Sequence, residues 1–246
     1  MTNAYSTMNQ INMNQIKTKA CYALATLLIT SISVIGPGSA FGQQTIGFRL
    51  GANVANETWN SPSNAPSQTS LTSIMLGIQT DYWIADMLAF EVQLLYDQKG
   101  TNTIYNGDFS NVQFNGTGEV RASYLEIPIL LKFRLPTPLL KPYVFAGPSI
   151  GVLLSSSNTS SGITSSGQPV SSNKSDALNS TDISALVGVG LELHITDNLN
   201  AFVDVGQAFG LQDVNKNVSV DPITNANVQT VKSKDLRVLA GIVLPL

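Results

Sequence analysis

Apolar and polar residues alternate along most of this chain, and the clearest case is the segment 123–134. One face of it would carry Leu125, Ile127, Ile129, Leu131 and Phe133, and the other Tyr124, Glu126, Pro128, Leu130, Lys132 and Arg134. A period of two residues is typical of a β-strand, in which successive side chains point to opposite faces. The segment therefore predicts a strand with one dry face and one face that carries every charge.

Seven other segments repeat this pattern, so we expect eight strands. Their ranges are 45–54, 74–84, 88–97, 123–134, 142–154, 183–195, 201–207 and 236–246. The facing of 142–154 is the least clear, because Tyr143 and Phe145 lie opposite an apolar row and Gly147-Pro148 indicates a bulge. No helical period competes with these strands, so the fold class is all-β.

The connections between the strands alternate between long and short. The long polar segments are 56–70, 99–118, 155–182 and 212–234, and the short ones are 85–87, 135–140 and 196–198. We expect hairpin tips at Asn106-Gly107 and Asn115-Gly116, and a mobile loop over 155–182. This alternation predicts an antiparallel up-and-down barrel with all long loops at one rim and both termini at the other.

A soluble barrel would alternate too, but three features favour a membrane-spanning one. The clearer strands span 10 to 13 residues, which is enough to cross a bilayer at a tilt. Their dry faces carry no charge. Glycine recurs on the polar faces, where a narrow lumen needs space: Gly47, Gly51, Gly77, Gly188, Gly190 and Gly241. An outer-membrane barrel accounts for all three features.

The first 42 residues read as a signal peptide that is removed before folding. Lys17 and Lys19 precede an apolar run over 20–35, which Gly-Pro-Gly ends, and small residues at 40–42 suit a signal peptidase. A membrane-spanning helix is the alternative, but the run is short for one. We therefore expect a mature domain over 43–246 that has lost Cys21 and has no disulfide to stabilise it.

The charge of the mature domain argues against nucleic acid as a partner. The whole chain has a formal net charge of −3, and without Lys17 and Lys19 the count is 11 basic against 16 acidic residues, 11 − 16 = −5. Proteins that bind nucleic acid usually carry a basic patch instead. We expect no nucleic-acid partner.

Three motifs resemble the PorT-like outer-membrane barrels common in Bacteroidota. They are IADMLAFEVQLLYDQKG at 84–100, SYLEIPILLKF at 123–133 and KPYVFAGP at 141–148. The resemblance implies an eight-stranded OmpA/OmpX-like transmembrane barrel in the outer membrane, with periplasmic termini. It also implies a bulge at Pro128, and it supplies no catalytic residue.

The polar faces together form a candidate lumen network. Its members are Arg49, Asp81, Glu91, Asp97, Glu126, Lys132, Arg134, Glu192, His194, Asp204 and Arg237. Six acids and four cations lie among them besides the histidine, so the set suits a salt-bridged plug, and a selectivity lining is the alternative. His194 is the only histidine, and without cysteine or a second histidine we expect neither a metal site nor a cofactor.

These observations favour a non-enzymatic outer-membrane protein with a structural or surface-interaction role through its four long loops. We expect outer-membrane lipid and lipopolysaccharide around it, a protein partner at the loops, and a monomeric barrel. The alternatives are an accessory of protein export, as the PorT-like resemblance suggests, a small channel, and a hydrolase of envelope lipids or surface peptides.

Overall fold

A computed structural model describes residues 43–59, 67–109, 112–164, 166–174, 179–212 and 231–246. The chain divides into two compact units, 1–42 and 43–246. The predicted signal peptide therefore lies outside the described residues, and the following concerns the second unit alone. Within the described ranges, no helix is long and apolar enough to cross a membrane.

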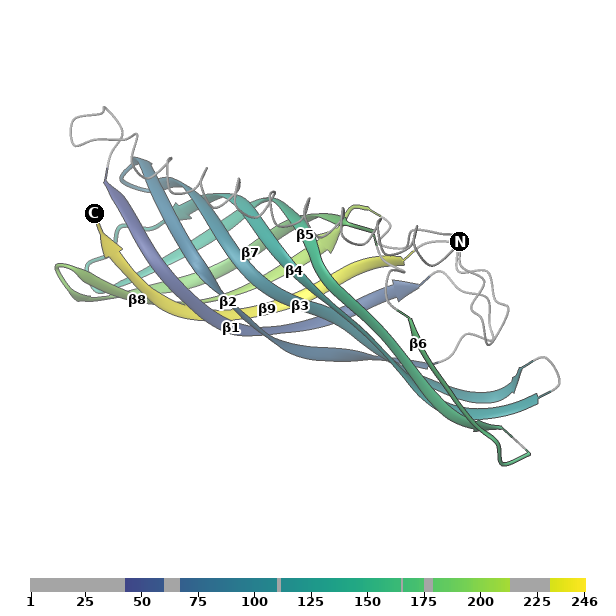
Figure 1. Cartoon of the computed structure of the whole chain (residues 1–246). Helices are drawn as coiled ribbons and strands as arrows, with labels where there is room; N and C mark the ends of the chain where they lie inside the picture. Colours follow the sequence, from purple (N-terminus) through teal and green to yellow (C-terminus); the bar gives the residue numbers. More distant parts are fainter. Residues whose placement is uncertain (1–42, 60–66, 110–111, 165, 175–178, 213–230) are drawn as a thin grey trace. The chain divides into compact units, whose positions relative to one another are not determined.

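The described residues form one antiparallel sheet that closes on itself (Figure 1). Its strands are β1 (Gln44–Trp59), β2 (Ser67–Ala85), β3 (Leu88–Phe109), β4 (Val112–Arg134), β5 (Leu140–Thr164), β6 (Pro169–Lys174), β7 (Thr181–Thr196), β8 (Leu199–Gly210) and β9 (Val231–Pro245). Eight of them make the ring β1-β2-β3-β4-β5-β7-β8-β9, because β4 also pairs with β5 and β9 with β1. This confirms the eight-stranded up-and-down barrel. The ninth, β6, pairs with β5 outside the ring.

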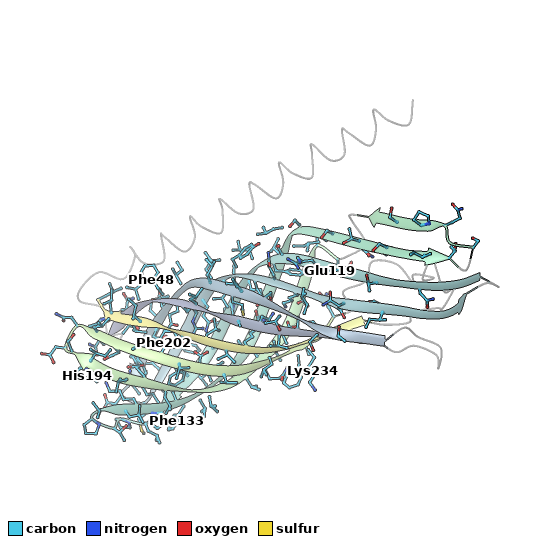
Figure 2. The ribbon with its side chains drawn as sticks, turned by 90° about the horizontal axis from the view of Figure 1, so that it is seen from below. Phe48, Glu119, Phe133, His194, Phe202 and Lys234 are labelled. Atoms are coloured by element: carbon cyan, nitrogen blue, oxygen red, sulfur yellow. The ribbon has the colours of Figure 1, made fainter. Side chains whose placement is uncertain are left out.

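The barrel wall separates two environments residue by residue. On β1, Phe48 and Leu50 are 54% and 60% exposed, whereas Arg49 between them is 4% exposed. Figure 2 shows Phe48 and Phe133 on opposite margins of the barrel in that view. Apolar side chains thus point outward and charged ones inward, the inverse of a water-soluble protein and the arrangement that lipid requires.

The short connections lie where the alternation places them, and the seam between the first and last strands is long. Strand ends leave only residues 86–87, 135–139 and 197–198 as turns. At the seam, β1 pairs with β9 from Thr45↔Pro245 to Trp59↔Val231, and the Leu246 N–H donates to the Gln44 carbonyl at 2.9 Å. No free strand edge remains in the ring.

Several strands run well past the predicted ends, which corrects the prediction of long loops. Strands β3 and β4 stay paired as far as Phe109↔Val112, and the predicted hairpin tips are wrong, because Asn106 pairs with Asn115 inside the ladder. Residues 155–164 continue β5 and 169–174 form β6, so most of 155–182 is strand. The segments 56–70 and 212–234 are also partly strand, at 56–59, 67–70 and 231–234, and residues 60–66 and 213–230 lie outside the described residues.

We call this added sheet the extension: residues 100–109 of β3, 112–121 of β4, 157–164 of β5, and β6. In Figure 1 it projects from one side of the barrel, where β3, β4, β5 and β6 continue together. More than half of its residues are Ser, Thr, Asn and Gly. Since neither face is an apolar row, the pattern that marks the barrel strands gives no sign of it.

The predicted bulges are wrong as well. Pro128 pairs with Ser149 in an unshifted register, and no shift with β7 occurs at Gly147 or Pro148. The proline interrupts the ladder with β3, where pairs are lacking between Val92↔Ile129 and Leu95↔Glu126, without an inserted residue. The missing N–H of proline thus costs local pairing only. The register shift of this region lies one strand along, at Leu154, between Ser123↔Ser155 and Tyr124↔Leu153.

Candidate functional site

The lumen holds two groups of ion pairs, and the first lies nearer the short turns. This turn-side cluster consists of Arg49, Lys132, Asp81, Glu91 and Asp204. Arg49 reaches Asp204 at 2.7 Å and Glu91 at 3.4 Å, while Lys132 reaches Glu91 at 3.0 Å and Asp81 at 3.2 Å. Each cation lies between two carboxylates, and all five side chains are buried.

Aromatic rings complete the turn-side cluster, and a glycine makes room for one of them. The Tyr143 hydroxyl donates to Asp204 at 3.1 Å, and the Lys132 ammonium lies 4.4 Å from the Tyr143 ring centre. Tyr143 pairs with Gly190 across the β5–β7 ladder. A Cβ on Gly190 would lie 2.2 Å from the ring, so only glycine admits this placement.

A smaller polar chain continues from this cluster to the turn rim. Arg134 pairs with Glu192 at 2.9 Å and stacks 3.7 Å from the Trp83 ring centre. Asn200 donates to the same carboxylate at 3.0 Å and contacts the His194 Nδ1 at 3.0 Å. Figure 2 shows His194 at one end of the barrel, and Glu119 and Lys234 toward the other. His194 thus belongs to a hydrogen-bonded rim chain.

The second group, the loop-side cluster, consists of Lys99, Arg237, Asp97, Glu126, Asp182 and Asp235. Arg237 reaches Glu126 at 2.8 Å and Asp97 at 3.6 Å. Lys99 lies within 2.5 Å of Glu126, 2.7 Å of Asp182 and 3.1 Å of Asp235. One ammonium group therefore links strands β3, β4, β7 and β9 at the level where the extension begins.

Three members of the loop-side cluster were not among the predicted lumen residues. Lys99, Asp182 and Asp235 fall at or beside the predicted strand ends, where the apolar partner row has already stopped. The two-residue phase would have found them, because Lys99 follows Asp97, Asp182 precedes Ser184, and Asp235 precedes Arg237 on the same faces. The residues that were predicted to line the lumen all lie in the two clusters or the rim chain.

Buried apolar side chains share the lumen with the two clusters. Met75, Leu95 and Leu239 form one buried group, and Phe145 and Leu186 belong to another. The cavity left between Arg49 and Arg237 is about 10 Å³, which is at the lower limit for a single water molecule. Little free space therefore remains between Arg49 and Arg237, as the narrow interior of an eight-stranded barrel leads one to expect.

The lumen carries more acid than base. Its ion pairs involve eight carboxylates and five cations, and the loop-side cluster alone has four carboxylates against two cations. Among the described residues, no group of three or more His, Cys, Asp or Glu is placed to hold a metal ion. The arrangement can hold the wall together and repel anions.

A family model for the outer membrane protein beta-barrel domain matches residues 41–216, well over half of the chain. The chain belongs to this family. A search among curated proteins gives no significant match. The family assignment and the closed sheet agree on an outer-membrane barrel.

Solved structures with a similar fold include several outer-membrane barrels. Neisserial surface protein A shares 18% identity, with a TM-score of 0.36 over 81% of this chain and 96% of that one. OprG of Pseudomonas aeruginosa shares 11% identity, with a TM-score of 0.45 over 84% and 97%. Ail of Yersinia pestis shares 12% identity, with a TM-score of 0.36 over 82% and 100%. These likenesses concern the fold alone.

Proposed function

We propose that this barrel is a non-enzymatic surface-interaction protein whose binding element is the extension. The observation that carries the proposal is the contrast between a filled lumen and a sheet that continues past it on one side. The cavity between Arg49 and Arg237 holds at most about one water molecule, whereas the extension presents an outer row of exposed polar side chains. That row includes Asn115, Thr117, Ser157, Thr159 and Ser161.

The partner that this element suits best is an extended segment of another protein. Within the described part of the chain, β6 pairs only with β5, so one edge of the extension keeps its backbone donors and acceptors for another strand. Strand addition at such an edge is a common mode of peptide recognition. The export-accessory role implied by the PorT-like resemblance would use the same edge.

The proposed orientation places the extension outside the cell and the short turns and described chain ends in the periplasm. The one-sided distribution of long connections supports it, as in other outer-membrane barrels. A cysteine at the exposed position Thr159 should react with an impermeant maleimide in intact cells, and one at Asn198 should not. Labelling of Asn198 alone would reverse the orientation.

Catalysis is not part of the proposal, because the only histidine lacks a nucleophile. Its ring nitrogens face Asn200 at 3.0 Å and Asp197 at 3.8 Å, and in the described residues no serine or threonine hydroxyl is among its partners. His194→Ala should therefore leave every cellular phenotype of the wild-type protein unchanged.

The decisive experiment removes the extension and keeps the barrel. A variant that lacks 104–117 and 158–174 is expressed in a deletion strain, which is then assayed for cargo secretion, detergent resistance and surface adhesion. We expect a folded barrel, seen as a heat-modifiable band, that fails to restore whichever phenotype the deletion produces. Full restoration by this variant would overturn the proposal.

A small channel is the second candidate, and the excess of lumen carboxylates favours it. If the lumen opened, its acidic lining would select cations. In planar bilayers we expect the purified barrel to show no steady conductance. A stable, cation-selective conductance of constant size would place the channel ahead of the surface-interaction role.

A further inference from the structure

The small cavity inside the barrel is lined by charged residues from both ion-pair clusters. Arg49 and Asp204 of the turn-side cluster line it together with Arg237 of the loop-side cluster, and Gln93 of β3 is the fourth polar residue. The rest of its lining is Leu95, Phe145, Leu186, Gly206 and Leu239. Its volume of about 10 Å³ is the space that one water molecule needs.

The two residues from the turn-side cluster each keep one polar atom that their ion pairs do not use. Arg49 contacts Asp204 with Nη2 and Glu91 with Nη1, so its Nε–H has no hydrogen-bond partner among the described residues. The Oδ2 atom of Asp204 accepts from Arg49 and from the Tyr143 hydroxyl, whereas its Oδ1 atom accepts from neither. This cluster therefore supplies one donor and one acceptor.

The other two polar residues of the lining are in the same position. Arg237 pairs with Glu126 through Nη2 at 2.8 Å, and its Nε and Nη1 have no partner in the described part of the chain. Gln93 donates from Nε2 to Glu91, which fixes the orientation of the amide and leaves Oε1 without a donor. All four side chains are buried, and a buried polar group without a partner loses stability comparable to a lost hydrogen bond.

These atoms form the set that a water molecule satisfies. Water accepts two hydrogen bonds, which the guanidinium groups of Arg49 and Arg237 can donate, and it donates two, which Gln93 Oε1 and Asp204 Oδ1 can accept. An anion would use the two donors and be repelled by the Asp204 carboxylate. A cation would use the two acceptors and be repelled by both arginines. Only a group that donates and accepts matches the whole lining.

We propose that one water molecule occupies this cavity, accepts hydrogen bonds from Arg49 and Arg237, and donates to Gln93 and Asp204. Because Arg49 belongs to the turn-side cluster and Arg237 to the loop-side cluster, this water joins the two clusters into a single hydrogen-bonded network. The inference concerns the lumen and does not rest on the proposed surface role.

Arginine side chains allow a direct test by nuclear magnetic resonance. The chain has arginine only at positions 49, 121, 134 and 237, so the barrel with ¹⁵N-labelled arginine in lipid nanodiscs gives four Nε–H signals, which Arg→Lys variants assign. A proton close to a bound water gives cross peaks at the water frequency with opposite signs in the laboratory-frame and rotating-frame Overhauser experiments. A proton that exchanges with bulk water gives the same sign in both.

We expect cross peaks of opposite sign at Arg49 and Arg237, and cross peaks of the exchange type at the exposed Arg121. Tyr143→Phe should keep the signals at Arg49 and Arg237. This variant removes the hydroxyl that contacts Asp204, whose proton could otherwise relay magnetisation from bulk water.

Gly206→Ala should make the cavity too small for water. A Cβ at position 206 would lie 3.2 Å from Leu186 and 3.3 Å from Phe145, which line the same cavity, so the methyl group and its displaced neighbours take up the space. Both water cross peaks should then be lost. Gly151→Ala is the matched control, because it adds a methyl group at ordinary contact distances and does not line the cavity, and it should keep both cross peaks.

Three results would overturn the proposal. The first is a wild-type barrel without cross peaks of opposite sign at Arg49 and Arg237, and this result does not depend on any variant. The second is a folded Gly206→Ala barrel, judged by heat modifiability, that keeps them. The third is an anomalous scattering peak in the cavity of crystals grown from sodium bromide, because the occupant would then be an anion.

Discussion

Strand β4 contains two regions with the same backbone pairing but different side chains and different surroundings. Over residues 122–134 it is barrel wall, with Ile129 and Leu131 exposed on the outside and Lys132 buried in the lumen. Over residues 112–121 it belongs to the extension, where the outer face carries Thr117 and Glu119. The same ladder continues through both, so hydrogen bonding does not distinguish them. The type of side chain therefore follows the environment of each region, whereas the backbone pairing is the same in lipid and in water.

The largest expected effect is the loss of a buried cation from the barrel. Arg237→Met removes the guanidinium from among Asp97, Glu126 and Asp235 and leaves buried carboxylates uncompensated. The free energy of unfolding should fall by about 3 to 5 kcal/mol. Reversible denaturation in micelles measures it.

Arg121 provides the matching substitution in the extension. It pairs with Glu119 at 2.7 Å, but both side chains are more than 40% exposed. Arg121→Met should therefore cost less than about 1 kcal/mol. Equal costs for the two substitutions would mean that the lumen cluster is solvated and the plug is open.

The cost in stability of a charge on the outer face should show whether that face meets lipid or water. Val189→Arg puts a guanidinium on the bare wall of β7 and should cost about 2 to 4 kcal/mol if the position is near the midplane. Thr159→Arg makes the same change on the outer face of the extension and should change stability by less than about 0.5 kcal/mol. If Thr159→Arg cost as much, the extension would lie in the membrane, contrary to its composition. Unfolding titrations in bilayers of defined thickness would measure both.

Packing inside the lumen gives a smaller effect. Gly190→Ala forces the Tyr143 ring from its place against the backbone and should cost about 1 to 3 kcal/mol. Gly151→Ala is the control, because its nearest neighbours would lie 3.4 Å from the new Cβ, an ordinary contact distance. Differential scanning calorimetry of both variants in the same detergent measures the loss of stability in each. A neutral Gly190→Ala would show that the ring can move freely and that the lumen is loosely packed.

The smallest effect is expected from shortening the extension. Removal of 104–117 takes away the outer pairs of the β3–β4 ladder, which include no member of either lumen cluster. Loop closure depends weakly on length, so the barrel should lose less than about 1 kcal/mol. A barrel that fails to fold without these residues, as judged by heat modifiability, would make the extension part of the folding core.

The comparison also explains what the sequence could and could not predict. In the barrel wall, lipid lies on one side and polar groups on the other, so each residue is constrained to one side. Alternating residues such as Phe48 and Arg49 therefore indicate a strand, the direction in which its side chains point and its register with the neighbouring strands. In the extension neither face demands apolar residues, so 155–164 resembles a loop although it is strand. The Asn-Gly pairs at 106–107 and 115–116 favour turns locally, but the ladder that continues through them prevails.

At the candidate site, prediction failed where periodicity ran out and where proline was concerned. Lys99, Asp182 and Asp235 lie just outside the apolar alternation of their strands, so the predicted strands were too short to include them. Pro128 was expected to insert a bulge, but the pairs missing near it leave the register of both ladders unshifted. Which ion pairs form depends on the stagger of the whole barrel, and one strand read alone does not contain it.

The seam between β1 and β9 has a consequence for assembly. It joins the first described strand to the last, from Thr45↔Pro245 to Trp59↔Val231. Until β9 pairs with β1, β1 has an open edge, and the ion pairs to Arg237 do not exist. Ring closure and the ion pairs of Arg237 are thus formed together, and a chain without β9 would keep an open strand edge of the kind that pairs with other chains.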